Sequence, residues 1–356
     1  MREFVHETRP VRVVLRAGAA GAATPQEAQH LGLRRLLVVS GPRGAETARA
    51  VADALGDACV GVHAEARMHV PAEVAERAVD VARSLGADGC VAVGGGSAIG
   101  LGKMIALRTG LTLIAVPSTY SGSEMTPVWG LTENGAKRTG RDPSVLPRSV
   151  VYDPELTLSL PVGLTVTSGI NAVAHAAEAL YAPDVSPLIA LTAEEGVRAM
   201  TGALPELVAD PEDPDARGRA LYGAWLCGAA LGATTMGLHH KLCHVLGGTF
   251  GLPHADTHTV VLPYALAHNA PAAPEAMAAL GRALDTEDVP GALWDLARRL
   301  GAPRSLAELG LKEADLAVAA GEATSRTYPN PRPVTTEGVL DVLRTAHRGD
   351  RPHTKY

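Results

Sequence analysis

The stretch GCVAVGGGSAIGLGKMIALRTGLTLIAVPST, residues 89–119, places a buried strand, a glycine loop, a helix and a second buried strand one after another. Both expected strands are short apolar runs, and the helix between them ends at a glycine, which commonly terminates helices. A strand, a helix and a second strand in this order form the unit from which parallel sheets with right-handed crossovers are built. In such sheets, ligands bind at the carboxyl ends of the strands.

The same alternation extends from this stretch toward the N-terminus and stops on its C-terminal side. Residues 121–153 carry turn signals and short β-like pieces that predict a hairpin excursion, and from residue 161 to about 349 only helical patterns follow. Because 356 residues are long for a single core, we expect two domains. They are an α/β nucleotide-binding domain with a parallel sheet, residues 1–160, and an all-helical domain, residues 161–356. The expected strands are 34–41, 58–66, 89–97 and 111–119, and the helices between them are 24–32, 47–56, 71–86 and 99–110.

Composition excludes several classes of function. The net charge is −6, no run of lysine or arginine exceeds a pair, and the chain has two phenylalanines, so neither a basic nor an aromatic surface for nucleic acid is expected. No segment approaches the roughly 20 apolar residues that cross a membrane, and the charged N-terminus lacks the apolar core of a signal peptide. We expect a cytoplasmic protein with no membrane partner.

The four cysteines, Cys59, Cys90, Cys227 and Cys243, form no CxxC pair. In a reducing compartment they are expected to be buried thiols. Because Cys243 adjoins His244, a reactive thiol at that position stays open as an alternative.

Two polar loops follow neighbouring expected strands. Gly94, Gly95, Gly96 and Ser97 open the helix that follows the first strand, where backbone N–H groups and the helix N-terminus attract a pyrophosphate. The loop is not the dinucleotide pattern G-x-G-x-x-G, and a tight structural turn is the alternative. The second loop, VPSTYSGSE, suits phosphate or ribose oxygens and carries the hydroxyls of Ser118, Thr119, Ser121 and Ser123.

The first expected strand ends at Ser40 and Gly41, where no acidic residue is present. An acidic residue at such a turn would bind the ribose 2′-hydroxyl and repel a 2′-phosphate. We therefore expect the chain to accept both NADH and NADPH.

Four histidines and an asparagine are spaced as a candidate site. Asn171 and His175 lie four residues apart, as do His240 and His244, so each pair shares one face of a helix, and His254 follows a Gly-Gly loop. Such a set could hold Fe or Zn. For any single histidine, a hydrogen-bonded core or surface residue is the alternative. His239 and His258 stay ambiguous.

Several segments together resemble the iron-containing alcohol dehydrogenase superfamily over essentially the whole chain. The resemblance implies a dehydroquinate synthase-like fold, with an α/β nucleotide domain and an all-helical domain, assembled as a homodimer. The segments are GGGS, VPSTYSGSEMT, NAVAH, HHKLCHVLGG, LPHADTH and YPNPRP.

The resemblance also implies roles for individual residues. Family nucleotide contacts fall on Gly95, Gly96, Ser97, Ser118, Thr119 and Ser123, with Lys137 near the nicotinamide end. Metal-dependent members bind their ion through Asp, His, His and His, and these positions are Asn171, His175, His240 and His254 here. Because an amide oxygen is neutral and a weaker ligand than a carboxylate, we expect that no metal is required. His244 matches a histidine that lies between nicotinamide and substrate.

The activity that the resemblance implies is NAD(P)H-dependent reduction of the C=C bond of maleylacetate to 3-oxoadipate, in the degradation of aromatic compounds. His175, His240, His244, His254 and Asn171 would form the catalytic set. The two substrate carboxylates need cations and donors, for which the candidates are Tyr120, Lys137, Arg138, Arg141 and Lys241. One alternative is an Fe- or Zn-dependent alcohol or aldehyde dehydrogenase of the same superfamily. A second is a non-catalytic nucleotide-binding or metal-sensing module.

Overall fold

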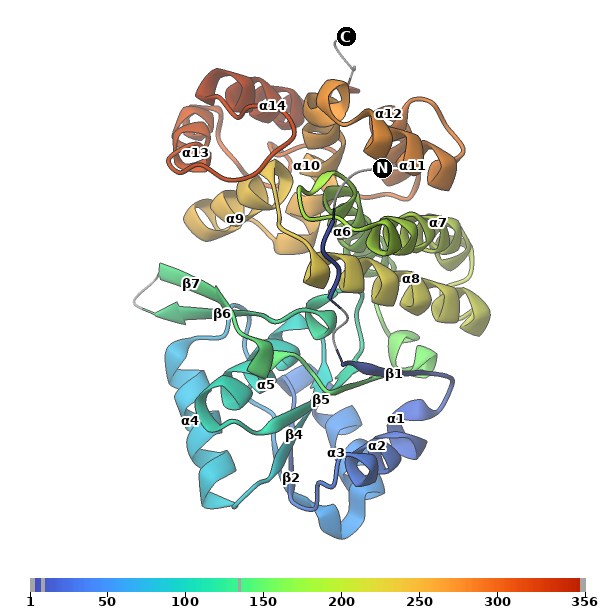
Figure 1. Cartoon of the computed structure of the whole chain (residues 1–356), viewed down its shortest axis with the longest axis vertical. Coiled ribbons are helices and arrows are strands. Elements are labelled where there is room, and N and C mark those ends of the chain that lie inside the picture. The colour runs from blue at the N-terminus through green and yellow to red at the C-terminus, as the bar shows by residue number, and fades with distance from the viewer. Residues whose placement is uncertain (1–3, 8–9, 134–135, 353–356) are drawn as a thin grey trace. The chain divides into compact units, whose positions relative to one another are not determined.

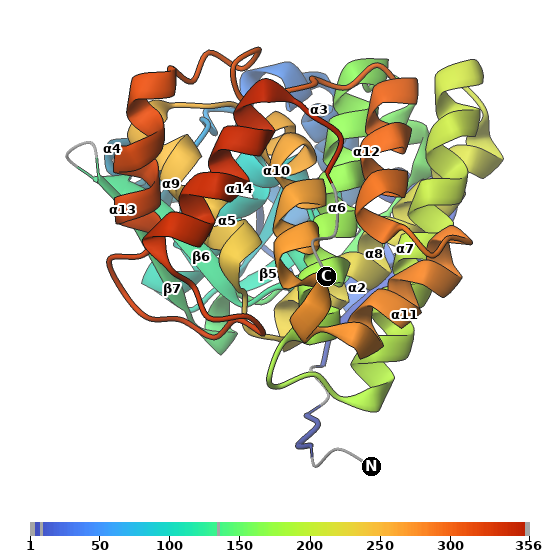
Figure 2. The same cartoon turned by 90° about the horizontal axis from the view of Figure 1, so that it is seen from above.

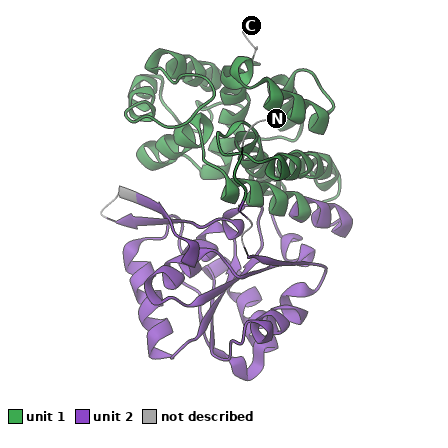
Figure 3. Cartoon of the chain, in the orientation of Figure 1, with its two compact units in different colours: residues 1–6, 161–211, 222–356 green, residues 7–160, 212–221 purple. Residues whose placement is uncertain are grey.

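The computed structural model describes residues 4–7, 10–133 and 136–352 (Figure 1). The chain divides into two compact units, coloured separately in Figure 3. Unit 2 comprises residues 7–160 and 212–221, and unit 1 comprises the residues up to His6, 161–211 and those from 222 on. This division differs from the expected 1–160 and 161–356 at two segments, because the chain start packs with the helical unit and residues 212–221 pack with the α/β unit.

Unit 2 is built on a parallel sheet of six strands in the order β1-β8-β5-β4-β2-β3. A separate antiparallel hairpin, β6–β7, is the excursion expected within residues 121–153. The strands are β1 (Arg12–Leu15), β2 (Leu36–Val39), β3 (Cys59–His63), β4 (Gly89–Gly94), β5 (Thr112–Pro117), β6 (Val128–Glu133), β7 (Ala136–Arg141) and β8 (Ser149–Tyr152).

Helices cover both faces of the sheet (Figure 1). Successive strand residues point to opposite faces, so Leu37 and Val39 pack with α4 and α5, whereas Leu36 and Val38 pack with α1, α2 and α3. This double cover explains why the central strands are apolar throughout. The helices are α1 (Ala19–Ala22), α2 (Thr24–His30), α3 (Ala45–Leu55), α4 (Ala72–Ser84) and α5 (Gly96–Thr109).

Two edge-side strands were not expected from the sequence. β1 and β8 are four residues each and pair with one another in parallel, from Arg12 opposite Ser149 to Leu15 opposite Tyr152. β8 lies within the segment expected to be only an excursion, and it returns the chain to the sheet beside β5. Both strands lie outside the alternation of strands and helices over residues 24–119, so no neighbouring helical pattern marks them in the sequence.

The described part of unit 1 contains helices without strands. In Figure 2, α10 lies centrally in this unit, and it packs against α6, α9, α12 and α14. Its core is mainly leucine, valine and alanine from α9, α10, α13 and α14. The helices are α6 (Val162–Tyr181), α7 (Pro187–Ala209), α8 (Pro214–Ala233, whose first residues belong to unit 2), α9 (Leu238–Phe250), α10 (His254–Asn269), α11 (Pro274–Leu284), α12 (Val289–Arg299), α13 (Leu316–Ala323) and α14 (Thr336–Arg348).

The expected fold class, an α/β unit with a parallel sheet plus an all-helical unit, is confirmed. Among the described residues, no single helix is both long and apolar enough to cross a membrane, although α8 and α9 pass that test together as a pair bent by 98°.

Candidate active site

The glycine loop of unit 2 lies between the end of β4 and the start of α5. Gly94 has a φ of 135°, a conformation that side chains disfavour. A Cβ on Gly95 would lie 3.0 Å from Cγ2 of Thr119, so the glycine allows the second loop to approach closely. The N–H of Ser118 donates to the carbonyl of Gly94 at 3.2 Å. The two polar loops that the sequence singled out are therefore in contact within unit 2.

Lys103 connects α5 to the end of the second loop and to the residues that follow it. Its buried ammonium donates to the carbonyls of Ser123 at 2.6 Å and Val128 at 2.7 Å, and to Oγ1 of Thr126 at 3.0 Å. Burial lowers the pKa of Lys103 to about 7, and the charge of Glu124 opposes this shift. Three acceptors match the three hydrogens of an ammonium group. Sequence reasoning missed this residue, whose one signal is a lysine within an apolar helix.

The remaining expected contacts of unit 2 are scattered. Gly41 precedes the short 3-10 helix Pro42–Gly44 after β2, and Ser123 begins another, Ser123–Met125. Arg138 and Arg141 are exposed on β7, where Arg138 forms an ion pair with Glu133 at 3.1 Å. The side chain of Lys137 lies outside the described residues.

Tyr120 is completely buried, and its hydroxyl accepts a hydrogen bond of 3.2 Å from Arg217. Arg217, at the start of α8, is buried as well and was not expected from the sequence. The pair explains why a short piece of α8 belongs to unit 2.

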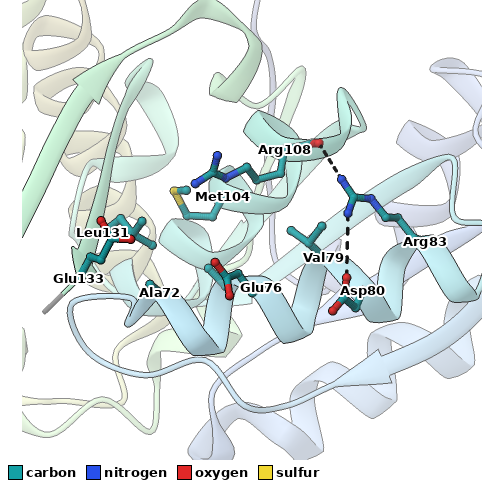
Figure 4. A pocket seen from close by; sticks show the side chains of 10 residues that line it. Ala72, Glu76, Val79, Asp80, Arg83, Met104, Arg108, Leu131 and Glu133 are labelled. Atoms are coloured by element: carbon teal, nitrogen blue, oxygen red, sulfur yellow. Dashed lines mark hydrogen bonds and ion pairs between the residues drawn. The ribbon is translucent and has the colours of Figure 1, made fainter.

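A mixed-charge cavity of about 270 Å³ also lies in unit 2, between α4, α5 and β6 (Figure 4). Arg83 at its rim donates to the carbonyl of Arg108 at 3.4 Å and forms an ion pair with Asp80 at 3.9 Å. The cavity contains none of the residues expected at the site, and its lining is Ala72, Ala75, Glu76, Val79, Asp80, Arg83, Met104, Arg108, Leu131 and Glu133.

Unit 1 gathers six histidines from three helices into what we call the histidine cluster. The ring centroids of His175 and His240 lie 5.2 Å apart, those of His240 and His258 5.0 Å apart, and those of His254 and His258 4.4 Å apart. The structure thus brings together four expected histidines and the two ambiguous ones. The members are His175 on α6, His239, His240 and His244 on α9, and His254 and His258 on α10.

The interior of the cluster is shielded from solvent, and its edge is exposed. His175, His239, His240 and His258 are buried, whereas His244 and His254 are exposed. Burial, with the positive charge that neighbouring histidines would carry, lowers the pKa of His239 to about 3 and those of His175 and His258 well below the usual range. These three rings are therefore neutral at pH 7.

Glu178 lies three residues after His175 on α6 and is completely buried. Its Oε2 lies 2.6 Å from Nδ1 of His240, within hydrogen-bond distance. Burial alone would raise the pKa of Glu178, but the hydrogen bond and charge of His240, the charge of His239 and the N–H of Gly237 lower it to about 2. This buried carboxylate was missed by sequence reasoning, although the H-x-x-E spacing placed it on the face of His175.

Several polar atoms around the cluster have no hydrogen-bond partner in the described part of the chain. They include Oδ1 of Asn171, Nδ1 of His175 and Nε2 of His240, all buried. Unpaired buried polar groups are costly, and native proteins retain them mainly where a ligand, ion or water binds. Lys241, the remaining expected contact in this unit, follows His240 on α9 and is half-buried.

Cys243 lies inside the same region, with its Sγ 3.8 Å from Nε2 of His239. Burial raises the pKa of this thiol well above its usual range. A thiol without thiolate character is a poor nucleophile, so the structure favours the buried interpretation over a reactive thiol.

Two family comparisons agree along the chain. Residues 10–154 match the iron-containing alcohol dehydrogenase family, and residues 165–347 match the C-terminal part of the Fe-containing alcohol dehydrogenase family. The chain belongs to the iron-containing alcohol dehydrogenase family. It is accordingly an oxidoreductase, as the resemblance implied.

Several relatives that are about half identical to this chain are maleylacetate reductases. A maleylacetate reductase from Burkholderia cepacia is 54% identical over 99% of this chain and 100% of the relative. One from Sphingobium indicum is 52% identical over 99% of each chain. The crystal structure of a maleylacetate reductase from Agrobacterium tumefaciens superimposes with a TM-score of 0.96, at 50% identity, over 99% of this chain and 100% of that one.

Because the family is named for iron, the histidine cluster must be compared with the ligand set that a divalent metal ion needs. Among the described residues, the three metal-ligating atoms that lie within 4.8 Å of one another belong to His239, Cys243 and His258, and the first and last of these already share a hydrogen bond of 2.9 Å. The donors of His175, His240 and His254 do not form such a group. The fourth family position, Asn171, supplies a neutral oxygen. These residues do not fit a tightly bound divalent ion.

Proposed function

We propose that this chain is a maleylacetate reductase that uses NADH or NADPH to convert maleylacetate to 3-oxoadipate. The observation that carries the proposal is Asn171, a buried amide beside the histidine cluster at the position where metal-dependent relatives carry a carboxylate. Removing that negative charge weakens metal binding and also removes a group that would repel a dianionic substrate. The names of the relatives at 54% and 52% identity support the substrate.

A bound NADH or NADPH would supply a hydride. Maleylacetate would accept that hydride at the alkene carbon that lies β to the ketone, and negative charge would develop on the ketone oxygen, giving an enolate. Protonation of the enolate at the carbon α to the ketone would give 3-oxoadipate, so that one hydride and one proton are added in total.

The chain must therefore supply a donor to the enolate oxygen and an acid for the α carbon. The imidazoles of His175, His240, His244 and His254 are the candidates for both roles. His240 offers its Nε2, because its Nδ1 is occupied by Glu178. We propose that no metal is required, since imidazole donors suffice for an enolate.

The nucleotide would bind through the two loops of unit 2. Backbone N–H groups at the start of α5 suit its pyrophosphate, and the hydroxyls of the second loop suit its remaining oxygens. The residues proposed for this role are Gly41, Gly94, Gly95, Gly96, Ser97, Ser118, Thr119 and Ser123, together with Lys137. The reaction requires that the nicotinamide held this way reaches a substrate held by the histidine cluster.

Cations must pair with the two substrate carboxylates. Arg138, Arg141 and Lys241 remain the proposed contacts, with Lys137. Tyr120 also remains proposed as a hydroxyl donor to the substrate, and its buried hydroxyl accepts a hydrogen bond from Arg217. A homodimer is proposed on the resemblance alone, and a cytoplasmic location is proposed from the sequence composition.

The decisive experiment follows NADH oxidation with maleylacetate as substrate, before and after dialysis against EDTA. We expect turnover that EDTA leaves unchanged, and formation of 3-oxoadipate. The alternative, an Fe- or Zn-dependent alcohol or aldehyde dehydrogenase, predicts no turnover of maleylacetate and EDTA-sensitive turnover of a simple aldehyde. A non-catalytic nucleotide-binding module predicts NADH binding with no turnover of either compound.

A further inference from the structure

We propose that Glu178 is a positioning residue that holds His240 in the tautomer with its hydrogen on Nδ1, so that Nε2 is the ring atom presented to the substrate. The structural half of this inference stands on the contacts of Glu178. Only its consequence for turnover rests on the proposed function.

The carboxylate of Glu178 is surrounded by donors. Its Oε1 accepts from the N–H of His239 at 2.8 Å and from the hydroxyl of Tyr181 at 3.1 Å. Its Oε2 accepts from the N–H of Gly237 at 3.1 Å and lies 2.6 Å from Nδ1 of His240. These donors help to lower the pKa of Glu178 to about 2, so the carboxylate is ionised and has no hydrogen to give to the ring. Nδ1 of His240 must therefore be the donor.

The same carboxylate fixes the backbone from which His240 projects. The N–H groups of Gly237 and His239 are at the N-terminus of α9, where a carboxylate is favourable and where backbone hydrogens lack partners within the helix. The intervening N–H, of Leu238, donates to Oδ1 of Asn330 at 3.2 Å. A Cβ at Gly237 would lie 3.0 Å from Oδ1 of Asn330 and 3.2 Å from Oε1 of Glu178, so glycine there allows both acceptors to approach.

Because Nδ1 of His240 is hydrogen-bonded to Glu178, Nε2 is the ring nitrogen that can bind a ligand. Nε2 is buried and has no hydrogen-bond partner in the described part of the chain. One face of the ring lies against His175, with their planes inclined by 29°. The ring therefore cannot exchange its two nitrogens without losing the bond to Glu178. This pairing resembles in principle the carboxylate that orients a catalytic imidazole in a hydrolase triad.

The test reads the tautomer directly, by long-range ¹H–¹⁵N NMR of protein labelled at its histidines, at a pH high enough that the ring carries one hydrogen. A His240→Gln variant identifies the signals of His240. In the unaltered protein we expect the hydrogen on Nδ1. A hydrogen on Nε2 would overturn the inference, and this measurement needs no change at Glu178.

The second experiment measures the His240 tautomer and kcat in a Glu178→Gln variant. The amide has one acceptor oxygen in place of two, so it cannot satisfy the backbone N–H groups and Nδ1 together. We expect the single Nδ1–H tautomer to be lost and kcat to fall about 10- to 100-fold. An unchanged tautomer with unchanged kcat would overturn the inference.

Tyr181→Phe is the matched control, because it removes a different donor from the same carboxylate and leaves the bond to His240 in place. We expect its His240 spectrum to match that of the unaltered protein. If the tautomer behaves as stated but maleylacetate is not turned over, the proposed function fails and the positioning of His240 stands.

Discussion

Nε2 of His239 lies 2.9 Å from Nδ1 of His258, joining α9 to α10 in the interior of the helical unit. Both rings are completely buried, and both are neutral at pH 7 because their pKa values are lowered. One ring must donate and the other accept. The hydrogen bond therefore fixes a complementary pair of tautomers between two neutral imidazoles.

Replacing one partner of this pair leaves the other buried and unpaired. For His258→Ala we expect a loss of about 2–4 kcal/mol in the free energy of unfolding, from the unsatisfied His239 and the space left behind. Urea unfolding followed by circular dichroism measures it. His244→Ala, an exposed histidine on the helix that carries His239, should change the same quantity by less than about 1 kcal/mol. Equal losses in both variants would contradict a structural role for the pair.

We expect the neutral amide of Asn171 to limit the metal affinity of the cluster. Asn171→Asp restores a carboxylate among three imidazoles, so we expect its affinity for Zn²⁺ to rise at least tenfold over that of the unaltered chain, measured by isothermal titration calorimetry. Asn171→Ala controls for loss of the amide and should not gain affinity. A stoichiometric metal in the unaltered enzyme, required for its activity, would refute this account.

We expect the turn after β2 to determine which nicotinamide cofactors the chain accepts. Without an acidic residue there, we expect kcat/KM for NADH and NADPH to differ by less than roughly a thousandfold, about 4 kcal/mol. Gly41→Asp should lower kcat/KM for NADPH at least tenfold more than for NADH, because its carboxylate would face the 2′-phosphate. Gly41→Ala introduces the same Cβ, 3.3 Å from the carbonyl of Ala66, without the charge, and should not discriminate.

Lys103 connects α5 to the segment beyond the second loop, so its removal should affect nucleotide binding more than chemistry. For Lys103→Met we expect a rise in KM for NADH of about tenfold and a loss of about 2–4 kcal/mol in stability, since two carbonyls lose their donor. Arg108→Met, an exposed cation farther along the same helix, is the control and should change neither quantity greatly. A stable Lys103→Met protein with unaltered KM would contradict the role.

Much of the fold follows from local pattern. The alternation over residues 24–119 predicted four strands of the sheet and the helices between them, because each is an apolar run bounded by glycine or a helix start. β1 and β8 were missed because they lie outside this alternation, β1 before its first helix and β8 after the hairpin.

The histidines were visible as a cluster in sequence, but their partners were not. Glu178 and His240 are 62 residues apart, and Leu238 and Asn330 are 92 apart. A buried hydrogen bond over such a separation leaves no periodic trace. Lys103 and Arg217 were missed because a single charged residue in a helix is usually exposed.

Thiol reactivity should separate one cysteine from the rest. Burial raises the pKa of Cys90 to about 12 and also raises those of Cys227 and Cys243, whereas Cys59 is half-buried. We expect an aromatic disulfide reagent to label only Cys59 rapidly in the native protein, and Cys59→Ser to abolish this rapid phase. All four should react in urea. Rapid labelling of Cys243 in the native state would restore the reactive-thiol interpretation.

The start of α9 depends on Asn330, a residue that lies 92 positions after Leu238 in the chain. Its amide oxygen accepts the N–H of Leu238 and a hydrogen from Asn269, so a residue near the end of the chain closes the start of the helix that carries three of the clustered histidines. While a ribosome is still adding residues before 330, α9 lacks this cap. The histidine cluster can therefore take its final form only in a chain that extends past residue 330, and a truncated chain ending earlier would present its histidines on an unfinished helix.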